Sequence, residues 1–179
     1  AQAKSLIQNG RCSEAIDPVQ KTYKSSFTKS SGEKAAVLLT ECYLREHNRV
    51  DAEKVSSRFL EYYVNSDYRE RMELAHAIVS VESGAVYEGV EAMLRILAYT
   101  KNQAARARTK DVAIQTLSAS LMTADQLQSL LEKYPVDRDV VGWMQLQIGR
   151  ECQNSKRFRA ARYWYKKVLA GEVAENLSS

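Results

Sequence analysis

Apolar side chains recur along this chain with the spacing of helix faces, and these faces return at a nearly constant interval. The residues that open the second helix of each predicted pair are mostly small: Ala15, Ala52, Gly89, Thr123 and Ala161. Successive members of this series lie 37, 37, 34 and 38 residues apart. Eight residues after each of them comes a large side chain: Tyr23, Leu60, Leu97, Leu131 and Leu169. A two-helix unit of about 34 residues is the repeat of an α-solenoid, so the pattern predicts an all-α array.

The pattern divides the chain into five predicted units within one helical-repeat domain over residues 1–179. Their approximate bounds are 1–30, 31–66, 67–101, 102–136 and 137–173. We expect about ten helices, arranged as five antiparallel hairpins in a right-handed superhelix. Only two prolines and seven glycines in 179 residues favour long helices over a turn-rich β fold.

Turn-forming residues predict where some helices begin and end. Residues 24–33 are rich in Ser, Thr, Lys and Gly, which predicts a loop before a helix over residues 34–46. Gly171 is expected to close the last helix, over residues 158–170.

The fourth unit carries the clearest start signal and the least certain register. Thr123 followed by Gln126 is a capping-box pattern, which predicts the start of a helix that ends at Lys133. The first helix of this unit can be aligned with those of the other units in two ways, based either on Asp111 or on Ala113.

Composition limits the classes of function that need to be considered. The net charge of +4, from 26 basic and 22 acidic residues, is too small to indicate nucleic-acid binding by itself. No segment approaches the roughly 18 uninterrupted apolar residues of a transmembrane helix, so no membrane span is expected. The sequence starts without Met and without a signal-like segment. We therefore expect a piece of a longer protein.

The three cysteines are Cys12, Cys42 and Cys152, an odd number that cannot pair completely within one chain. We expect buried free thiols that pack as small hydrophobic side chains, in preference to a metal site. The lack of a disulfide spacing leans slightly toward a cytoplasmic protein, although exported proteins also contain reduced cysteines.

Residues that could carry catalytic chemistry are sparse. The two histidines are His47, in a predicted turn, and His76, in the middle of a predicted helix. Neither has a Cys, Asp or Glu partner at metal-ligand or catalytic-triad spacing. The sequence also lacks a glycine-rich phosphate loop and a metal-type Cys/His cluster. It therefore predicts no catalytic residues, no metal and no cofactor.

The fifth unit resembles the tetratricopeptide repeat (TPR). Its first helix reads Trp143-Met-Gln-Leu-Gln-Ile-Gly149, and its second helix carries Phe158, Ala161 and Tyr165. This is similar to the large-to-small pattern by which paired helices cross in that family, with Gly149 and Ala161 at the close crossing. Further matches are the interhelix turn over 10–15 and the closing stretch over 131–135. The resemblance implies a non-catalytic solenoid that binds another protein or a peptide.

In that family the binding groove comes mainly from the first helix of each hairpin. The corresponding residues here are Lys34, Val37, Glu41, Arg71, Leu74, Ile78, Trp143, Gln147 and Arg150. They would form a mixed surface with apolar patches, suited to an extended peptide or a helix. Each of them could equally serve in hairpin packing. A Lys/Asn/Arg clamp for a C-terminal carboxylate is not expected, because the positions where such a clamp would lie hold Val37, Glu41, Leu74 and Ile78.

The last predicted helix is rich in basic and aromatic residues. The patch consists of Arg159, Arg162, Tyr163, Trp164 and Lys166. It could bind phosphates or an acidic partner, with an aromatic ring available for stacking. The interpretation we favour is the solvated outer face of a solenoid helix, so nucleic acid is an unlikely partner.

The leading hypothesis is an interaction scaffold that forms one domain of a larger bacterial protein. The divergent repeats resemble helical-repeat domains of envelope assembly proteins, such as outer-membrane assembly lipoproteins and the N-terminal domains of penicillin-binding-protein activators. That resemblance implies a periplasmic or outer-membrane-associated location over a cytoplasmic one. The alternatives are a nucleic-acid-binding helical repeat and a regulatory domain of an enzyme that lies beyond residue 179.

Overall fold

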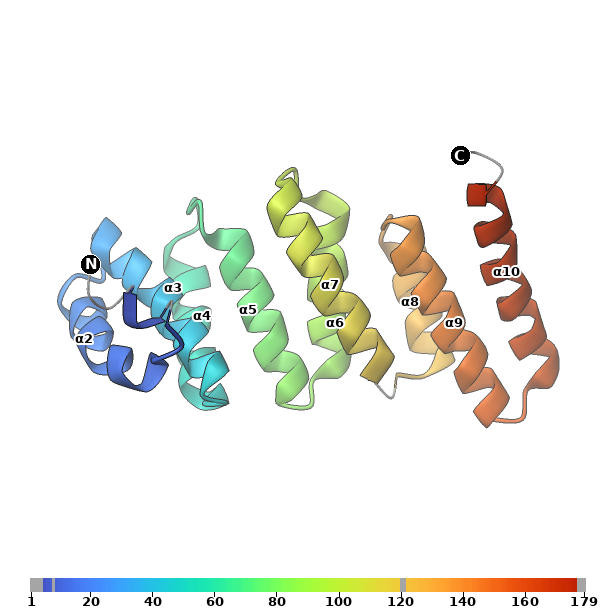
Figure 1. Ribbon diagram of the computed structural model, residues 1–179, viewed down its shortest axis with the longest axis horizontal. Coiled ribbons are helices and arrows are strands. Elements are labelled where there is room, and N and C mark those ends of the chain that lie inside the picture. The colour runs from blue at the N-terminus through green and yellow to red at the C-terminus, as the bar shows by residue number, and fades with distance from the viewer. Residues whose placement is uncertain (1–4, 8, 120–121, 177–179) are drawn as a thin grey trace. The chain divides into compact units, whose positions relative to one another are not determined.

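The structure, a computed structural model, describes residues 5–7, 9–119 and 122–176, and within these ranges it is helical without any strand. The helices are α2 (Cys12–Ser25), α3 (Ser30–Arg45), α4 (Arg49–Tyr62), α5 (Arg69–Glu82), α6 (Val86–Tyr99), α7 (Gln103–Ala119), α8 (Ala124–Lys133), α9 (Arg138–Asn154) and α10 (Phe158–Asn176) (Figure 1). Ala1–Gly89 and Val90–Ser179 form two compact units, which we call unit 1 and unit 2. The predicted all-α fold class is confirmed.

Each unit has the neighbour relations of a helical-repeat array. In unit 1, α5 packs on both α3 and α4, and α3 also packs on α2. In unit 2, α9 packs on both α7 and α8, and α10 packs on α9. A helix that contacts both helices of the preceding hairpin buries an apolar face that the hairpin could not bury alone.

Four hairpin turns in the described part of the chain share one backbone conformation. Gly10, His47, Gly84 and Lys156 have positive φ angles of 76°, 55°, 95° and 59°. The N–H of the next residue donates to the carbonyl five residues earlier, in the pairs Arg11–Leu6, Asn48–Tyr43, Ala85–Ser80 and Arg157–Cys152. This is the Schellman ending of a helix, which places one residue in the left-handed region. The sequence repeat therefore has a counterpart in the backbone.

Apolar helix faces build the core of each unit. In unit 1 the buried cluster includes Val19, Tyr23, Leu39, Tyr43, Phe59, Met72 and Val79. In unit 2 the fully buried side chains include Met93, Leu94, Leu97, Leu117, Leu127, Leu130, Met144 and Ile148. These side chains come from every helix pair, as the apolar spacing predicted.

Helix α3 begins earlier than the sequence indicated, at Ser30 instead of Lys34. The predicted loop over residues 24–33 is therefore wrong at both of its ends. A Cβ on Gly32 would lie 2.1 Å from the carbonyl oxygen of Ser26. Gly32 thus lets the first turn of α3 lie against the preceding backbone. In the sequence alone, a glycine in this stretch looks like part of a loop.

Thr123 is not the counterpart of the other small residues in the repeat series. It is the exposed N-cap of α8, and its predicted capping box with Gln126 is confirmed. In α2, α4, α6 and α10 the small residue is the fourth of the helix, and in α8 that position holds Leu127, which is 2% exposed. The fourth hairpin therefore carries a large side chain where the others carry Ala or Gly.

In unit 2 the structure shows the register of α7 and the extent of α10. Ala113 is fully buried while Asp111 is exposed, so the register of α7 is the one based on Ala113. Helix α10 continues through Gly171 to Asn176, so the predicted end at Gly171 is wrong. A single glycine costs a helix only about 1 kcal/mol, which is too little to end one.

Candidate functional site

In unit 1 the predicted groove residues lie on α3 and α5, which are in contact. The Arg71 guanidinium donates from Nε to Oε1 of Glu41 at 2.6 Å, so the two predicted residues bridge these helices. Val37 and Leu74 are only 3% and 5% exposed. Val37 belongs to the buried core cluster of unit 1, and Leu74 is buried as well, so, contrary to the prediction, neither side chain offers a surface to a partner.

The other predicted residues of this groove are more accessible. Lys34 is exposed on the first turns of α3, and Ile78 is half-buried on α5. Their part in binding stays a prediction. Because Glu41 and Arg71 neutralise each other, the described groove of unit 1 has little net charge to offer a ligand.

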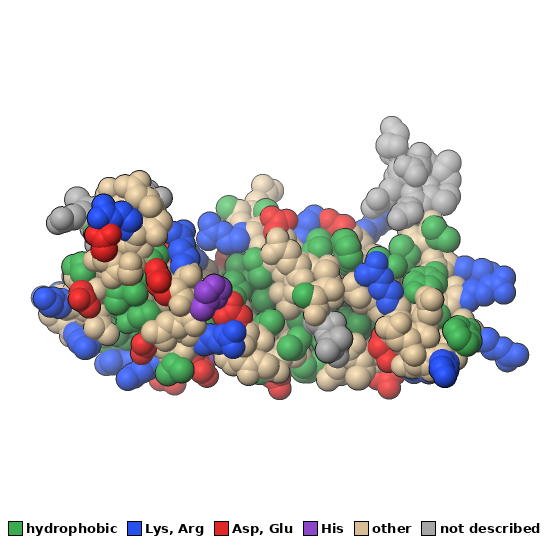
Figure 2. All heavy atoms as spheres, turned by 60° about the horizontal axis from the view of Figure 1, so that its bottom comes forward, with side chains coloured by type: hydrophobic (Ala, Val, Ile, Leu, Met, Phe, Trp, Pro, Cys, Tyr) green, Lys and Arg blue, Asp and Glu red, His purple; other side chains and the backbone are tan. Residues whose placement is uncertain are grey.

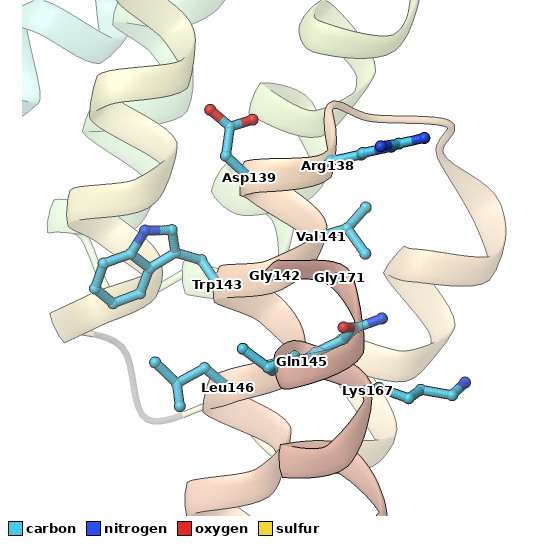
Figure 3. Close-up of a pocket in the computed structure, with 10 residues that line it drawn as sticks. Arg138, Asp139, Val141, Gly142, Trp143, Gln145, Leu146, Lys167 and Gly171 are labelled. Carbon is cyan, nitrogen blue, oxygen red and sulfur yellow. The ribbon is translucent and has the colours of Figure 1, made fainter. Parts of the chain in front are cut away.

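In unit 2 a pocket of about 550 Å³ lies between α9 and α10 (Figure 3). Its lining residues come from the first half of α9 and the second half of α10: Arg138, Asp139, Val141, Gly142, Trp143, Gln145, Leu146, Lys167, Val168 and Gly171. Among the predicted groove residues only Trp143 lines this pocket. Gln147 and Arg150 lie further along α9, half-buried and exposed respectively.

Two glycines explain why this space is open. A Cβ on Gly142 or on Gly171 would meet no atom within 4 Å. Gly149, further along the same helix α9, differs, because a Cβ there would lie 2.6 Å from the ring of Tyr165. The helix pair is therefore tightly packed at Gly149 and hollow beside Gly142.

The charges around the pocket are unevenly paired. Asp139 forms an ion pair with Lys110 of α7, and its hydrogen bond raises the pKa of Lys110. Lys167 has its Nζ 4.9 Å from the ring centroids of both Tyr163 and Trp164. Among the described side chains, no carboxylate pairs with Lys167 or with Arg138. The lining thus offers two cations, while its one carboxylate already has a partner.

The basic patch predicted on α10 faces outward beside this pocket. Arg159, Arg162 and Lys166 are exposed, and Tyr163 is 54% exposed, while Trp164 is half-buried. Figure 2 shows Lys and Arg side chains on the surface of α10 as well as on other parts of the chain. In the part of the chain that the structure describes, these three cations have no ion-pair partner. A surface of this kind attracts an acidic ligand.

Comparison with known proteins bears on the fold. No protein-family model matches the sequence, and a search of curated proteins finds no match either. Among solved structures, the chain is similar to a crystal structure described as kinesin light chain nearly identical TPR-like repeats, from Podospora anserina. The match has a TM-score of 0.50 and covers 99% of this chain and 94% of that one.

The chain has a TPR-like helical-repeat fold. The sequence identity to the kinesin light chain structure is 15%, so the likeness concerns the fold alone. It agrees with the resemblance seen in the fifth unit, whose two helices are α9 and α10.

Ser56 and His76 form a polar pair that resembles a catalytic pair, but the Ser56 side chain is buried. The Oγ of Ser56 lies 3.1 Å from Nδ1 of His76, and it also donates to the carbonyl of Glu53. Sequence reasoning missed this pair because its members lie 20 residues apart. Ser56 is 0% exposed, so a substrate has no access to its hydroxyl. The pair therefore serves to satisfy two polar groups between α4 and α5.

The described residues of this TPR-like chain contain no group of three or more His, Cys, Asp or Glu side chains that could hold a metal ion. None of the helices described is long and apolar enough to cross a membrane. The α9–α10 pocket is thus the site with the most developed geometry. The sequence did not reveal the role of its glycines, because Gly142 looks no different there from the tightly packed Gly149, and Gly171 was expected to end a helix.

Proposed function

We propose that this TPR-like chain is a non-catalytic interaction module whose α9–α10 pocket takes an apolar side chain from an acidic segment of a partner protein. The observation that carries the proposal is the hollow beside Gly142 and Gly171, whose lining includes Arg138 and Lys167, two cations that no carboxylate among the described residues pairs with. TPR-like folds generally mediate protein–protein interaction, and the pocket gives this general role a place on the chain.

The size and lining of the pocket suit a peptide side chain. A volume of about 550 Å³ falls in the range of pockets that bury most of a drug-sized ligand, which is enough for a large side chain. Val141, Leu146 and Val168 supply apolar walls, and Trp143 adds an aromatic surface of the kind enriched at binding hot spots. An apolar anchor would fit this lining.

The charges around the pocket favour acidic residues on either side of that anchor. Arg138 and Lys167 lie in the lining itself, and the outward face of α10 adds Arg159, Arg162 and Lys166. Asp139 repels an incoming carboxylate less than an isolated acid would, because Lys110 already neutralises it. A basic partner would meet like charges, and electrostatic complementarity of this kind selects among partners.

We further propose that the chain is one domain of a larger bacterial protein associated with the cell envelope, in the periplasm or at the outer membrane. This rests on the resemblance of its divergent repeats to envelope assembly proteins. Fractionation of cells that produce the full-length protein tests it, and recovery in the cytoplasm alone would contradict it.

The two tryptophans of the chain provide a direct probe of the pocket. Both Trp143 and Trp164 lie in or beside it, so a ligand bound there changes the intrinsic tryptophan emission. The ligands are two synthetic helical peptides with the same apolar positions, one with Glu and the other with Lys at every polar position. We expect saturable binding of the Glu peptide and at least tenfold weaker binding of the Lys peptide.

Charge-reversal variants locate the binding surface. The test variant carries Arg159→Glu, Arg162→Glu and Lys166→Glu, and the control carries Lys21→Glu, Lys24→Glu and Lys54→Glu on exposed positions of unit 1. Only the test variant should lose affinity for the Glu peptide, by roughly tenfold or more, since each cation contributes a fraction of a kcal/mol to about 1 kcal/mol. Equal losses in both variants would show attraction to net charge alone and would contradict the proposed site.

A further inference from the structure

Two of the three cysteines lie together in unit 1. The Sγ atoms of Cys12 and Cys42 are 2.6 Å apart, although 30 residues separate them in the chain. Cys12 is the first residue of α2, and Cys42 lies in α3, the helix that packs on it. Both are 1% exposed, in a small cluster with Ile7 and Ala15. The spacing in the sequence did not reveal this pair.

Neither metal binding nor thiol catalysis accounts for the pair. A structural zinc site needs four ligands, and the described residues hold no third ligand near these sulfurs. Burial, followed by the neighbouring thiol of Cys12, raises the pKa of Cys42 to about 12. A thiol that stays protonated at neutral pH is a poor metal ligand and a poor nucleophile.

We propose that Cys12 and Cys42 are a disulfide-forming pair that links α2 covalently to α3 when the protein meets a disulfide oxidant. A disulfide has an S–S bond of about 2.05 Å, so the two sulfurs need to approach by less than 1 Å. Because they lie on two helices that already pack together, bonding requires no change of fold. Cys152, in α9 of unit 2, is left as a free thiol.

The reaction is thiol–disulfide exchange with a small-molecule or protein disulfide, RSSR. One cysteine thiolate attacks a sulfur of RSSR, which forms a mixed disulfide and releases RS⁻. The second cysteine thiolate then attacks the protein sulfur of the mixed disulfide, which forms the Cys12–Cys42 bond and releases another RS⁻. In total, two protein thiols and RSSR give one protein disulfide and two RSH, and two electrons pass to the oxidant.

The exchange needs a local opening, because the closed cluster excludes the oxidant. Cys12 is favourably placed for this, as it begins a helix and lies in the same buried cluster as Ile7, from the segment before the turn. That segment is held by a hydrogen bond from Nη1 of Arg45 to the carbonyl of Ile7, 2.9 Å long. Opening the turn at Gly10 would therefore expose the thiol without unfolding the core of unit 1.

The bond would restrain the N-terminal end of unit 1. It joins α2 to the same helix, α3, that carries Lys34 and Glu41 of the predicted groove. In an oxidising compartment such as the periplasm the pair would be bonded, and in a reducing one it would stay as two thiols. This inference does not depend on the proposed function, because the α9–α10 pocket lies in the other unit.

Refolding of the whole chain in a glutathione redox buffer tests the proposal, because it lets all three thiols reach equilibrium with the oxidant. Thiol counting should find one free thiol per chain after refolding. It should find three free thiols per chain only after dithiothreitol treatment. A non-reduced digest should contain a Cys12–Cys42 peptide pair that is 2 Da lighter than its reduced parts. The oxidised chain should melt about 10 °C above the same chain after reduction.

Single serine variants provide the controls. Cys152→Ser should keep the bond and the shift in melting temperature, while Cys12→Ser and Cys42→Ser should each lose both. Three free thiols after refolding, glutathione attached separately to Cys12 and Cys42, or a bond from either of them to Cys152 would each overturn the proposal. Comparing oxidised and reduced wild-type chain keeps the test valid even where a variant fails to fold.

Discussion

The ring of Tyr165 in α10 covers Gly149 in α9, with its Cε1 only 2.6 Å from where a Cβ on Gly149 would lie. The Tyr165 hydroxyl donates to Oε1 of Gln153 at 2.8 Å, which holds the ring in place. The sequence suggested that Ala161 would meet Gly149 at the close crossing. Ala161 is buried, but the atoms nearest to Gly149 belong to Tyr165, one turn further along α10.

Gly149→Ala is expected to destabilise the chain by about 1–3 kcal/mol, because the added methyl group overpacks against the Tyr165 ring. Gly142→Ala is the matched control in the same helix, since a Cβ at Gly142 meets no atom within 4 Å. The Gly142→Ala substitution should stabilise the folded chain by about 0.5–1 kcal/mol through helix propensity alone. Urea unfolding followed by circular dichroism measures both, and two changes of the same sign would show that the crossing is placed wrongly.

The repeat, the helix faces and the fold class could be predicted from the sequence because they depend on local period and side-chain volume. The site could not, because it depends on which neighbour covers each position. Gly142 and Gly149 are both glycines of the same helix, and the sequence does not distinguish them. Gly142 nevertheless borders a pocket, whereas Gly149 lies under an aromatic ring. Likewise, the burial of Val37 and Leu74 depends on tertiary packing, which no single helix pattern specifies.

The turn residues His47 and Lys156 should be replaceable by glycine with a gain in stability. Both have positive φ, where a Cβ costs about 1–2 kcal/mol that glycine avoids. Since glycine also adds freedom to the unfolded chain, the net gain expected for His47→Gly or Lys156→Gly is about 0.5–1 kcal/mol. Both side chains are exposed, so no packing is lost. A loss of stability in both variants would contradict the Schellman assignment.

Acid should weaken unit 2 through the Asp137–Arg106 ion pair. The hydrogen bond from Arg106 lowers the pKa of Asp137 below its ordinary value of 3.8. A lowered folded-state pKa gives stability that is present above the ordinary pKa and is lost as the pH falls through the folded pKa. Asp137→Asn should therefore cost up to about 1 kcal/mol at pH 7, and nothing once the carboxyl is protonated in both states. A penalty that does not change between pH 7 and pH 2 would rule out this origin.

The basic face of α10 is expected to bind nucleic acid only weakly. A protein that neutralises several phosphates loses affinity steeply as salt rises, and the described patch offers no repeated stacking platform. Binding of a single-stranded oligonucleotide, followed by fluorescence anisotropy, should disappear near physiological salt and should not change with Trp164→Ala. Tight binding at physiological salt that is lost in the Arg159, Arg162 and Lys166 charge-reversal variant would favour the nucleic-acid alternative.

The most direct test of the proposed function is to fill the pocket without disturbing the fold. Gly142→Leu places a side chain in the open space beside Gly171, and its helix propensity should leave the melting temperature equal to or above that of the wild-type chain. The affinity for the Glu peptide, measured by isothermal titration calorimetry, is predicted to fall at least tenfold, while Lys54→Leu on the exposed face of α4 leaves it unchanged. Unaltered affinity in a stable Gly142→Leu chain would contradict the claim that this pocket receives the partner.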